Sequence, residues 1–318
     1  MSLNTGESGL LISIVAPVFD AAEHARTFVE AFARQSLPGK VELILVDDGS
    51  QTPLSIAFEG NDGLDFSIVR LPHNQGRAAA RNAGIAASSA PYVAFMDIDC
   101  IPQTDFLEHL AAQIATGADL VFGHVEFRSG DNYFDAYENR VQQSRQSDLG
   151  NWQLRMTSAN FAVRRDVLTA VGGFDSSYRQ YGLEDRDLFI RIRQSFPDLQ
   201  PVYRKDCSVT HVDRPLLDDV LRKFEAMGQH AAPLFRRNHP REYAAMPLHY
   251  FDARFLDAYR VLPKAVLSRL ALSAHSTSNW VFALARKWRW QGVANTSLRL
   301  LKGLTFLRGT LLDEATND

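Results

Sequence analysis

The chain has 318 residues, of which 46% are hydrophobic and 22% charged, which is the composition of a folded globular protein and excludes wholesale disorder. Its formal net charge of −3 excludes a general nucleic-acid-binding protein, which needs a basic surface. No apolar stretch approaches the roughly 20 residues of a membrane-spanning helix. Two cysteines are too few for a disulfide framework and favour a reducing, cytoplasmic location.

The first hundred residues alternate short apolar runs with helical patterns. Strands are expected at 10–17, 41–46, 66–70 and 92–96, and helices at 22–35 and 76–87. Because strands that alternate with helices form βαβ units, this order predicts an α/β, Rossmann-like fold with a mostly parallel central sheet flanked by helices. Ligands bind such sheets beyond the carboxyl ends of the strands. Here those ends carry Pro17, Asp47, Asp48, Asp97 and Asp99.

The rest of the chain has a mixed pattern followed by a helical one. Helices are expected at 106–115, 131–147 and 183–195, and strands at 119–127, 158–163 and 202–212. From Leu216 onward the patterns are helical and interrupted by prolines. We therefore expect a boundary near Arg214–Pro215, between an α/β domain of residues 1–215 and a helical extension of residues 216–318.

The two parts differ in charge. Residues 1–215 carry 19 Lys and Arg against 28 Asp and Glu, whereas residues 216–318 carry 15 against 9. Residues 259–312 hold nine basic residues and no acid, with tryptophans at 280, 288 and 290. Basic amphipathic helices with tryptophan are typical of segments that lie on a membrane surface. Helices packed on the α/β domain or on a second copy explain the pattern equally well.

The triplet Asp97-Ile98-Asp99 follows an apolar strand. In an extended segment the side chains of residues i and i+2 point the same way, so we expect both carboxylates on one side. Paired carboxylates at a strand end suit Mg²⁺ or Mn²⁺ that also holds substrate phosphates. His211, at the end of a later extended segment, is a candidate further ligand, since neutral imidazole binds Mn²⁺. A solvated acidic turn and a structural histidine are the alternatives.

Two loops after the early strands carry candidate nucleotide contacts. Asp47-Asp48-Gly49-Ser50 is a turn signal, and one of its carboxylates is positioned to accept hydrogen bonds from a base or ribose. Asn74 is the expected N-cap of the following helix. Arg77 and Arg81 lie four residues apart on one face of that helix, which suits a nucleotide diphosphate. The alternative is a solvated face with surface ion pairs.

Glu184 and Asp185 fall in the first turn of an expected helix. The helix dipole favours ionised carboxylates at this end, and an ionised carboxylate in a cleft is what a general base for a hydroxyl nucleophile requires. The alternative is helix-terminal electrostatics without chemistry.

Together these motifs resemble the family 2 glycosyltransferases of the GT-A fold. They come in the family's order and span residues 10 to about 212. The matching segments are Ile14–Val18, Val46–Ser50, Asn74-x-Gly76-x4-Arg81-Asn82, Asp97-x-Asp99, Val171–Asp175 and Glu184-Asp185.

The resemblance implies an inverting transfer of a hexosyl or N-acetylhexosaminyl group from a nucleotide-sugar, usually UDP-linked, to an acceptor hydroxyl, with Mn²⁺ or Mg²⁺ as cofactor. By that similarity Asp185 is the catalytic base, and Glu184 holds sugar hydroxyls. Asp99 binds the metal, and His211 matches a metal-binding histidine. Residues that would contact the nucleotide-sugar are Pro17, Asp47, Asp48, Asn74, Arg77, Arg81 and Asp97.

The resemblance further suggests bacterial polysaccharide or glycolipid synthesis, with a glycan or lipid-linked acceptor and peripheral contact at the inner face of the membrane. One alternative is a nucleotide-sugar-binding or scaffold protein that retains the fold without turnover. A nucleotidyltransferase is a further alternative, but residues 17–22 lack the Gly-rich basic loop that this class needs after its first strand. Release of UDP on sugar transfer separates the three.

Overall fold

The computed structural model describes residues 10–58, 60–128, 133–146, 149–213, 216–254 and 264–312. The chain divides into two compact units. Unit 1 consists of Met1–Arg179 and Asp185–Asp213, and unit 2 of Gln180–Glu184 and Arg214–Asp318. The expected boundary residues, Arg214 and Pro215, lie outside the described residues.

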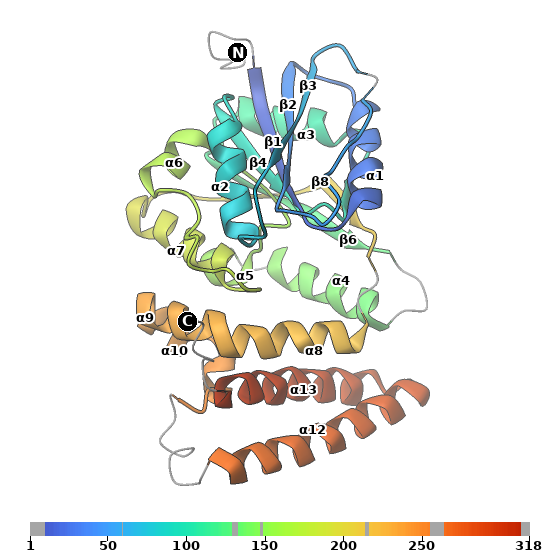
Figure 1. The fold of residues 1–318 in the computed structure, drawn as a ribbon, viewed down its shortest axis with the longest axis vertical. Helices are drawn as coiled ribbons and strands as arrows, with labels where there is room; N and C mark the ends of the chain where they lie inside the picture. The colour runs from blue at the N-terminus through green and yellow to red at the C-terminus, as the bar shows by residue number, and fades with distance from the viewer. Residues whose placement is uncertain are drawn as a thin grey trace. The chain divides into compact units, whose positions relative to one another are not determined.

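The described strands of unit 1 form one eight-stranded sheet in the order β3-β2-β1-β4-β7-β6-β8-β5 (Figure 1). The first four strands in this order are parallel to one another, whereas β7 runs antiparallel to both β4 and β6. At the far edge β8 is parallel to β6 and antiparallel to β5, so the sheet is mixed. The strands are β1 (Leu10–Val18), β2 (Lys40–Asp47), β3 (Leu64–Arg70), β4 (Tyr92–Met96), β5 (Cys100–Pro102), β6 (Leu120–Phe127), β7 (Asn160–Arg164) and β8 (Val202–His211).

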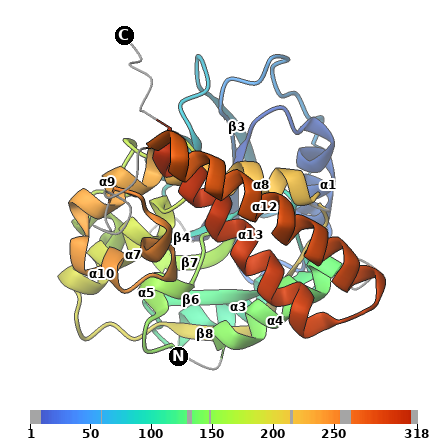
Figure 2. The same ribbon diagram turned by 90° about the horizontal axis from the view of Figure 1, so that it is seen from below.

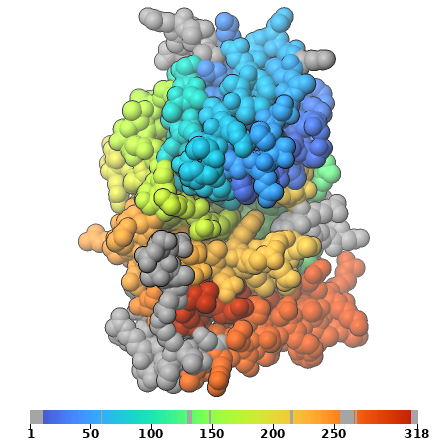
Figure 3. Space-filling view, in the orientation of Figure 1, coloured from blue at the N-terminus to red at the C-terminus, as the bar shows by residue number. Residues whose placement is uncertain are grey.

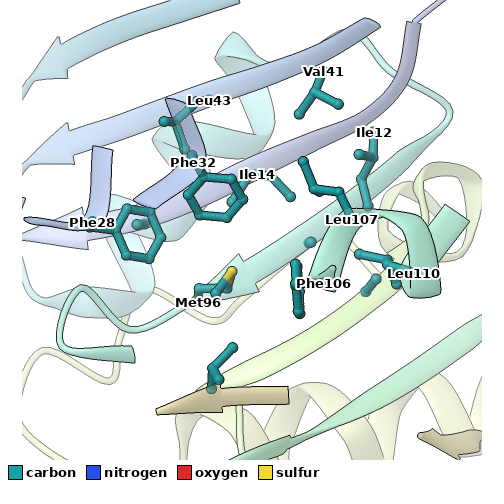
Figure 4. Close-up of a cluster of buried hydrophobic side chains, with 14 of the residues drawn as sticks. Ile12, Ile14, Phe28, Phe32, Val41, Leu43, Met96, Phe106, Leu107 and Leu110 are labelled. Atoms are coloured by element: carbon teal, nitrogen blue, oxygen red, sulfur yellow. The ribbon is translucent and has the colours of Figure 1, made fainter. Parts of the chain in front are cut away.

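Helices cover both faces of this sheet. Alternate residues of β1 point to opposite faces of the sheet. Ile14 packs on the face that α1 and α3 cover, and Val15 on the face that α2 and α7 cover. Figure 4 shows the first cluster, with Phe28 and Phe32 of α1 against the sheet. The helices are α1 (Ala22–Ala33), α2 (Arg77–Ala87), α3 (Phe106–Ala115), α4 (Tyr133–Gln146), α5 (Trp152–Arg155), α6 (Arg165–Ala170) and α7 (Glu184–Ser195).

Burial on both faces explains the near-continuous apolar run of β1. The alternating strands and helices of unit 1 confirm the predicted α/β class, although the sheet is mixed rather than mostly parallel. The short elements β5, α5 and α6 were not expected, because segments of three to six residues carry too little periodicity to stand out.

Unit 2 is helical in most of its described residues, as expected for the C-terminal extension. Figures 1 and 2 show α13 between α8 and α12. Glycines allow α13 to cross closely over the end of α8 and the η1 turn that follows it. A Cβ on Gly309 would lie 2.1 Å from the Glu225 carbonyl oxygen, and a Cβ on Gly228 would lie 2.4 Å from the Phe306 carbonyl oxygen. The elements are α8 (Leu217–Ala226), the π-helical turn η1 (Met227–Ala231), α9 (Ala232–Asn238), α10 (Pro240–Ala244), the 3₁₀ turn η2 (Pro247–Phe251), α12 (Lys264–Lys287) and α13 (Gln291–Leu311).

Within the described ranges, none of the helices combines the length and the hydropathy that crossing a membrane requires.

Candidate active site

The candidate site lies at the carboxyl ends of β1, β2 and β4. Strand β1 pairs with β2 on one side and with β4 on the other, so the chain order reverses beside β1. Such a switch point is where open α/β sheets bind ligands. Asp47 is the last residue of β2 and Asp48 follows it, whereas Asp97 and Asp99 lie directly after β4.

Asp47 organises the loop that follows β2. Its side chain is 0% exposed, and its two oxygens accept hydrogen bonds from the amides of Ser50 (2.9 Å) and Leu54 (3.0 Å). Arg70, at the end of β3, donates to the same carboxylate and also to the Ser50 carbonyl oxygen, at 2.9 Å. Burial alone would raise the pKa of Asp47, but these hydrogen bonds outweigh it and lower the pKa. Asp47 thus shapes the loop from beneath.

Asp48 ties the β2 loop to the start of α2. Its two oxygens accept hydrogen bonds from the amides of Gln75 (2.8 Å) and Gly76 (2.9 Å), and burial raises the pKa of this carboxyl. The two loops approach so closely that a Cβ on Gly49, whose φ is +72°, would lie 2.4 Å from the backbone of His73. A side chain at position 49 is therefore excluded on both steric and conformational grounds.

The expectation that Asn74 caps α2 was wrong. The N-cap is Gly76, without a side-chain cap, at φ +90°, and Asn74 Oδ1 accepts from the Gly76 amide at 3.1 Å across a turn of two residues. The left-handed backbone at Gly76, and the 2.4 Å that would separate a Cβ there from the Arg179 carbonyl oxygen, leave room only for glycine. Asn74 itself is exposed.

Arg81 and Asp97 form a partly buried ion pair. Arg81 is 1% exposed, and its Nη2 donates to Asp97 Oδ1 at 2.9 Å. The guanidinium also lies over the ring of Phe174, 5.2 Å from its centroid, a cation–π contact. Burial would raise the pKa of Asp97, but the charges of Arg81 and Arg77 outweigh it and lower the pKa. Arg81 is thus no part of a solvated helix face.

Asp97 and Asp99 do not lie in one extended segment, as the sequence had suggested. Strand β4 ends at Met96, and the Cys100 amide closes a turn by donating to the Asp97 carbonyl oxygen at 2.9 Å. The turn directs the two carboxylates to different partners, because Asp97 meets Arg81 whereas Asp99 meets His211.

Asp99 and His211 face each other across the β5–β8 edge. His211 Nε2 lies 3.3 Å from Asp99 Oδ2, and Phe127 stacks on the imidazole with ring centroids 4.8 Å apart. Burial raises the pKa of Asp99; His211 opposes this shift, and the charge of Asp97 adds to it. Both side chains remain partly open to solvent.

The other nitrogen of His211 fixes the tautomer of the ring. Nδ1 lies 3.1 Å from the Asp213 carbonyl oxygen, which only accepts hydrogen bonds, so Nδ1 carries the proton. In a neutral imidazole Nε2 then presents a lone pair to the Asp99 carboxylate. Two acceptors that face each other repel, and a bound cation or a proton on Nε2 would remove this repulsion.

Glu184 and Asp185 begin α7, as expected. Glu184 is buried whereas Asp185 is partly exposed, so only the second presents its carboxylate to solvent. Asp185 Oδ1 accepts from the Arg186 amide at 2.8 Å. Leu183, the residue before α7, has a left-handed backbone with φ +71°. This is a strained conformation of the kind that clusters at functional sites.

Two residues that support the site escaped the sequence reasoning. Arg70 pairs with Asp47, its partner across the parallel β2–β3 register, and opposite charges at neighbouring strand ends are a readable signal. Asn82 belongs to a motif whose spacing predicts no role for its side chain. It binds the backbone of Phe174 through both atoms of its amide, a contact over 92 residues that no local pattern encodes.

Comparison with known proteins identifies a family. The family model described as glycosyl transferase family 2 matches residues 13–172, and one described as the N-terminal domain of galactosyltransferase matches residues 142–211.

Two curated relatives show the extent of the likeness. Glycosyltransferase AglE of Haloferax volcanii is 34% identical over 169 residues, which cover 51% of this chain and 55% of AglE. The pre-mycofactocin glycosyltransferase of Mycobacterium tuberculosis is 31% identical over 256 residues, covering 76% of this chain and 51% of the relative. The chain thus spans about half the length of these relatives.

Two solved structures share the fold. The mannosyltransferase PcManGT of Pyrobaculum calidifontis, in complex with GDP-Man and Mn²⁺, aligns with a TM-score of 0.57 at 16% identity, over 91% of this chain and 85% of that one. S. aureus TarS 1–349 in complex with UDP-GlcNAc aligns with a TM-score of 0.53 at 14% identity, over 91% and 90%. At these identities the likeness shows the fold alone, and it confirms the expected GT-A architecture.

Proposed function

The chain belongs to glycosyl transferase family 2, and from this premise we propose that it transfers a sugar from a UDP-linked donor to an acceptor hydroxyl, with inversion at the anomeric carbon. The observation that carries the proposal is the Asp99–His211 pair at the carboxyl edge of the sheet.

The residues of this pair fit a divalent cation. A carboxylate and an imidazole that present lone pairs to the same space, with the second imidazole nitrogen held by a backbone carbonyl, are the usual arrangement around a bound metal. The described residues hold no cluster of three or more His, Cys, Asp or Glu ligands. Two protein ligands leave positions for diphosphate oxygens and water, as Mg²⁺ and Mn²⁺ sites at nucleotides do.

We therefore propose that Asp99 and His211 hold Mn²⁺ or Mg²⁺. The cation, when bound, supplies charge that stabilises the departing diphosphate. Phe127 keeps the imidazole in its plane, and the Asp213 carbonyl keeps the proton on Nδ1.

The donor is proposed to bind beyond β1, β2 and β4. Asp97 faces the ribose or organises this end of the site, and Arg81 holds its carboxylate in place. Asp47 acts through the loop that it supports. The remaining proposed donor contacts are Pro17, Asp48, Asn74 and Arg77.

Asp185 is proposed as the general base that accepts the proton of the acceptor hydroxyl, and Glu184 as its neighbour that holds sugar hydroxyls. An ionised Asp185 at the start of α7 is stabilised by the helix dipole. Its partial exposure lets an acceptor reach it.

We extend the proposal to the organisation and setting of the protein. Residues 1–215 form the catalytic domain, and residues 216–318 form the helical, basic region. The acceptor is a glycan or a lipid-linked sugar of bacterial polysaccharide or glycolipid synthesis. The protein acts in the cytoplasm, with peripheral membrane contact through 259–312. The two buried thiols, Cys100 and Cys207, suit a reducing compartment.

Calorimetry with a panel of UDP-sugars and GDP-sugars tests the donor proposal. In the presence of Mn²⁺ we expect one UDP-sugar to bind, and we expect a chelator and the substitution Asp99→Ala each to abolish binding. Binding that is equally tight with chelator contradicts the metal site, and a preference for GDP-sugars contradicts the UDP assignment. Release of UDP on addition of an acceptor then establishes transfer.

A further inference from the structure

The outer face of α12 carries large apolar side chains that are exposed. Exposed residues recur at helical spacing along the helix, and Figure 3 shows α12 at the surface of the molecule. Trp280 is 65% exposed and Leu270 55%, values that are unusual for large apolar side chains. Exposed residues of this face are Val266, Leu270, Ser273, Thr277 and Trp280, and Trp288 follows the end of the helix at Lys287.

The opposite face of α12 is already packed. Ala271, Ser278, Phe282 and Ala285 are buried, and Ala271 packs with Leu304 and Leu307 of α13. The helix therefore has a structural face toward α13 and a second apolar face that the fold does not use. Large apolar side chains that are exposed along one face of a helix are typical of a binding surface.

The turn after α12 has an unexpected residue at its key position. The amide of Trp290 donates to the Ala285 carbonyl oxygen (2.8 Å) and that of Arg289 to the Arg286 carbonyl oxygen (3.1 Å), which together form a Schellman motif. The left-handed position of this motif usually holds glycine, but here it holds Arg289, with φ +56°. The strained backbone at Arg289 is of the kind that is found at functional sites.

This turn presents a cation between two indoles. Trp288 is 61% exposed and Trp290 55%, and Arg289 is also exposed. Tryptophan is enriched where an apolar phase meets water, because its ring is apolar and its N–H needs a polar partner. Arginine beside it suits an anionic partner.

The basic charge around α12 indicates which kind of partner binds its outer face. Residues 259–312 carry nine basic residues and no acid, and five that the structure describes as exposed are Arg269, Arg286, Lys287, Arg289 and Arg299. A second copy of this chain docked through the same face would set like charges against each other, which is unfavourable. The surface of an anionic bilayer matches both the basic charge and the apolar face.

We infer that the outer face of α12 and the Trp288-Arg289-Trp290 turn form the membrane-binding surface, and that its ligand is an anionic phospholipid bilayer. This deepens the peripheral contact proposed above and rests on it. The helix lies in the interface, with Trp280 and Leu270 among the acyl chains and the basic residues at the phosphates.

Co-sedimentation of the full chain with vesicles tests the inference. We expect binding to vesicles of equimolar phosphatidylcholine and phosphatidylglycerol, loss of binding at high salt, and little binding to phosphatidylcholine alone. No donor or metal is added, so the result is independent of sugar transfer. Equal binding to both vesicles, or binding to neither, overturns the inference even where turnover is present.

Two variants locate the surface. Trp280→Ala should weaken binding several-fold, and Arg289→Gly about fivefold, the effect of one basic residue near the bilayer surface. Arg289→Gly should also leave the thermal unfolding midpoint unchanged or raise it, because glycine suits the backbone there. The controls Leu216→Ala and Arg222→Gln change exposed residues of α8 and its start and should bind as the wild type does. Unchanged binding in both test variants, or a lipid-independent dimer that Trp280→Ala dissociates, contradicts the inference.

Discussion

The side chain of Asn82 binds the backbone of Phe174. Its amide nitrogen donates to the Phe174 carbonyl oxygen at 2.7 Å, and its amide oxygen accepts from the Phe174 amide at 2.9 Å. The ring of Phe174 in turn lies against the guanidinium of Arg81, which pairs with Asp97. Helix α2 thereby fixes both a distant loop and the carboxylate at the end of β4.

Substitution of Asn82 by Ala should therefore lower stability by about 2 kcal/mol, since it leaves backbone groups of Phe174 without partners. The free energy of unfolding in urea measures the effect. Ser176→Ala is the control, because it removes only the 3.1 Å contact with the Asn82 amide. An equal loss in the two variants would show that the Phe174 contacts contribute nothing special.

Arg70 supports the nucleotide loop through two contacts. We expect Arg70→Met to cost about 1–3 kcal/mol, because the buried Asp47 carboxylate and the Ser50 carbonyl both lose a donor, and to weaken donor binding. Calorimetric donor titration and urea unfolding measure the two effects. Arg26→Met, which breaks only an exposed pair with Glu23, should change neither by more than about 0.5 kcal/mol.

Asp252 anchors unit 2 and makes its stability depend on pH. Tyr243 donates to Asp252 Oδ2 at 2.6 Å and Arg254 Nε to Oδ1 at 2.9 Å. Burial would raise the pKa of Asp252, but Arg254 and Tyr243 outweigh it and lower the pKa from its ordinary value of 3.8.

A lowered pKa in the folded state means that the stabilisation by Asp252 is complete above about 3.8 and is lost as the pH falls through the folded-state value. Asp252→Asn should thus be less stable than the wild type at pH 7, and the difference should shrink below pH 3.8. Thermal unfolding across this range provides the measurement. A difference that is constant with pH would contradict the assignment.

Asp185→Asn tests the general base. We expect kcat to fall by about 10²–10⁴-fold, while the Kd of the donor stays near that of the wild type, because the amide keeps the shape but accepts no proton. Asp175→Asn, a partly exposed carboxylate that binds the Ser177 amide, is the matched control. Retained turnover in Asp185→Asn would assign the base to another residue.

Metal binding should depend on the surroundings of His211. We expect His211→Ala to abolish Mn²⁺-dependent donor binding and Phe127→Leu to lower the Mn²⁺ affinity about tenfold, since groups that orient a ligand contribute on this scale. Titration of Mn²⁺ in calorimetry, with UDP present, reads both effects. If His211→Ala binds the donor as the wild type does, with and without chelator, the histidine is structural.

The elements most faithfully predicted were those that periodicity defines. Strand β4 and helix α3 have the bounds expected from the sequence, because buried strands and amphipathic helices leave long apolar patterns. The direction of β7 was not readable. Its pairing with β4 and β6 is decided by long-range packing.

Motifs located the candidate site but not its internal contacts. From the sequence, Asp97 and Asp99 are expected to point the same way toward a cation. The structure differs because a turn, closed by the backbone hydrogen bond from Cys100 to Asp97, separates their directions. Such a backbone hydrogen bond has no signature in the sequence. It treated Asp47 as a ligand contact, whereas Asp47 is fully buried beneath its loop. The assignment of a donor contact to it stays a prediction.

The position of α13 in unit 2 bears on how the protein is made. The segment that α13 covers, from α8 to η1, leaves the ribosome first, and about 65 residues separate the end of α8 at Ala226 from the start of α13 at Gln291. At ordinary translation rates this interval lasts roughly 3–13 s. During that time Gly228 and Glu225 lack α13, whose backbone at Phe306 and Gly309 lies close to them in the folded protein. The close crossing at Gly228 and Gly309 therefore cannot form until α13 has been synthesised.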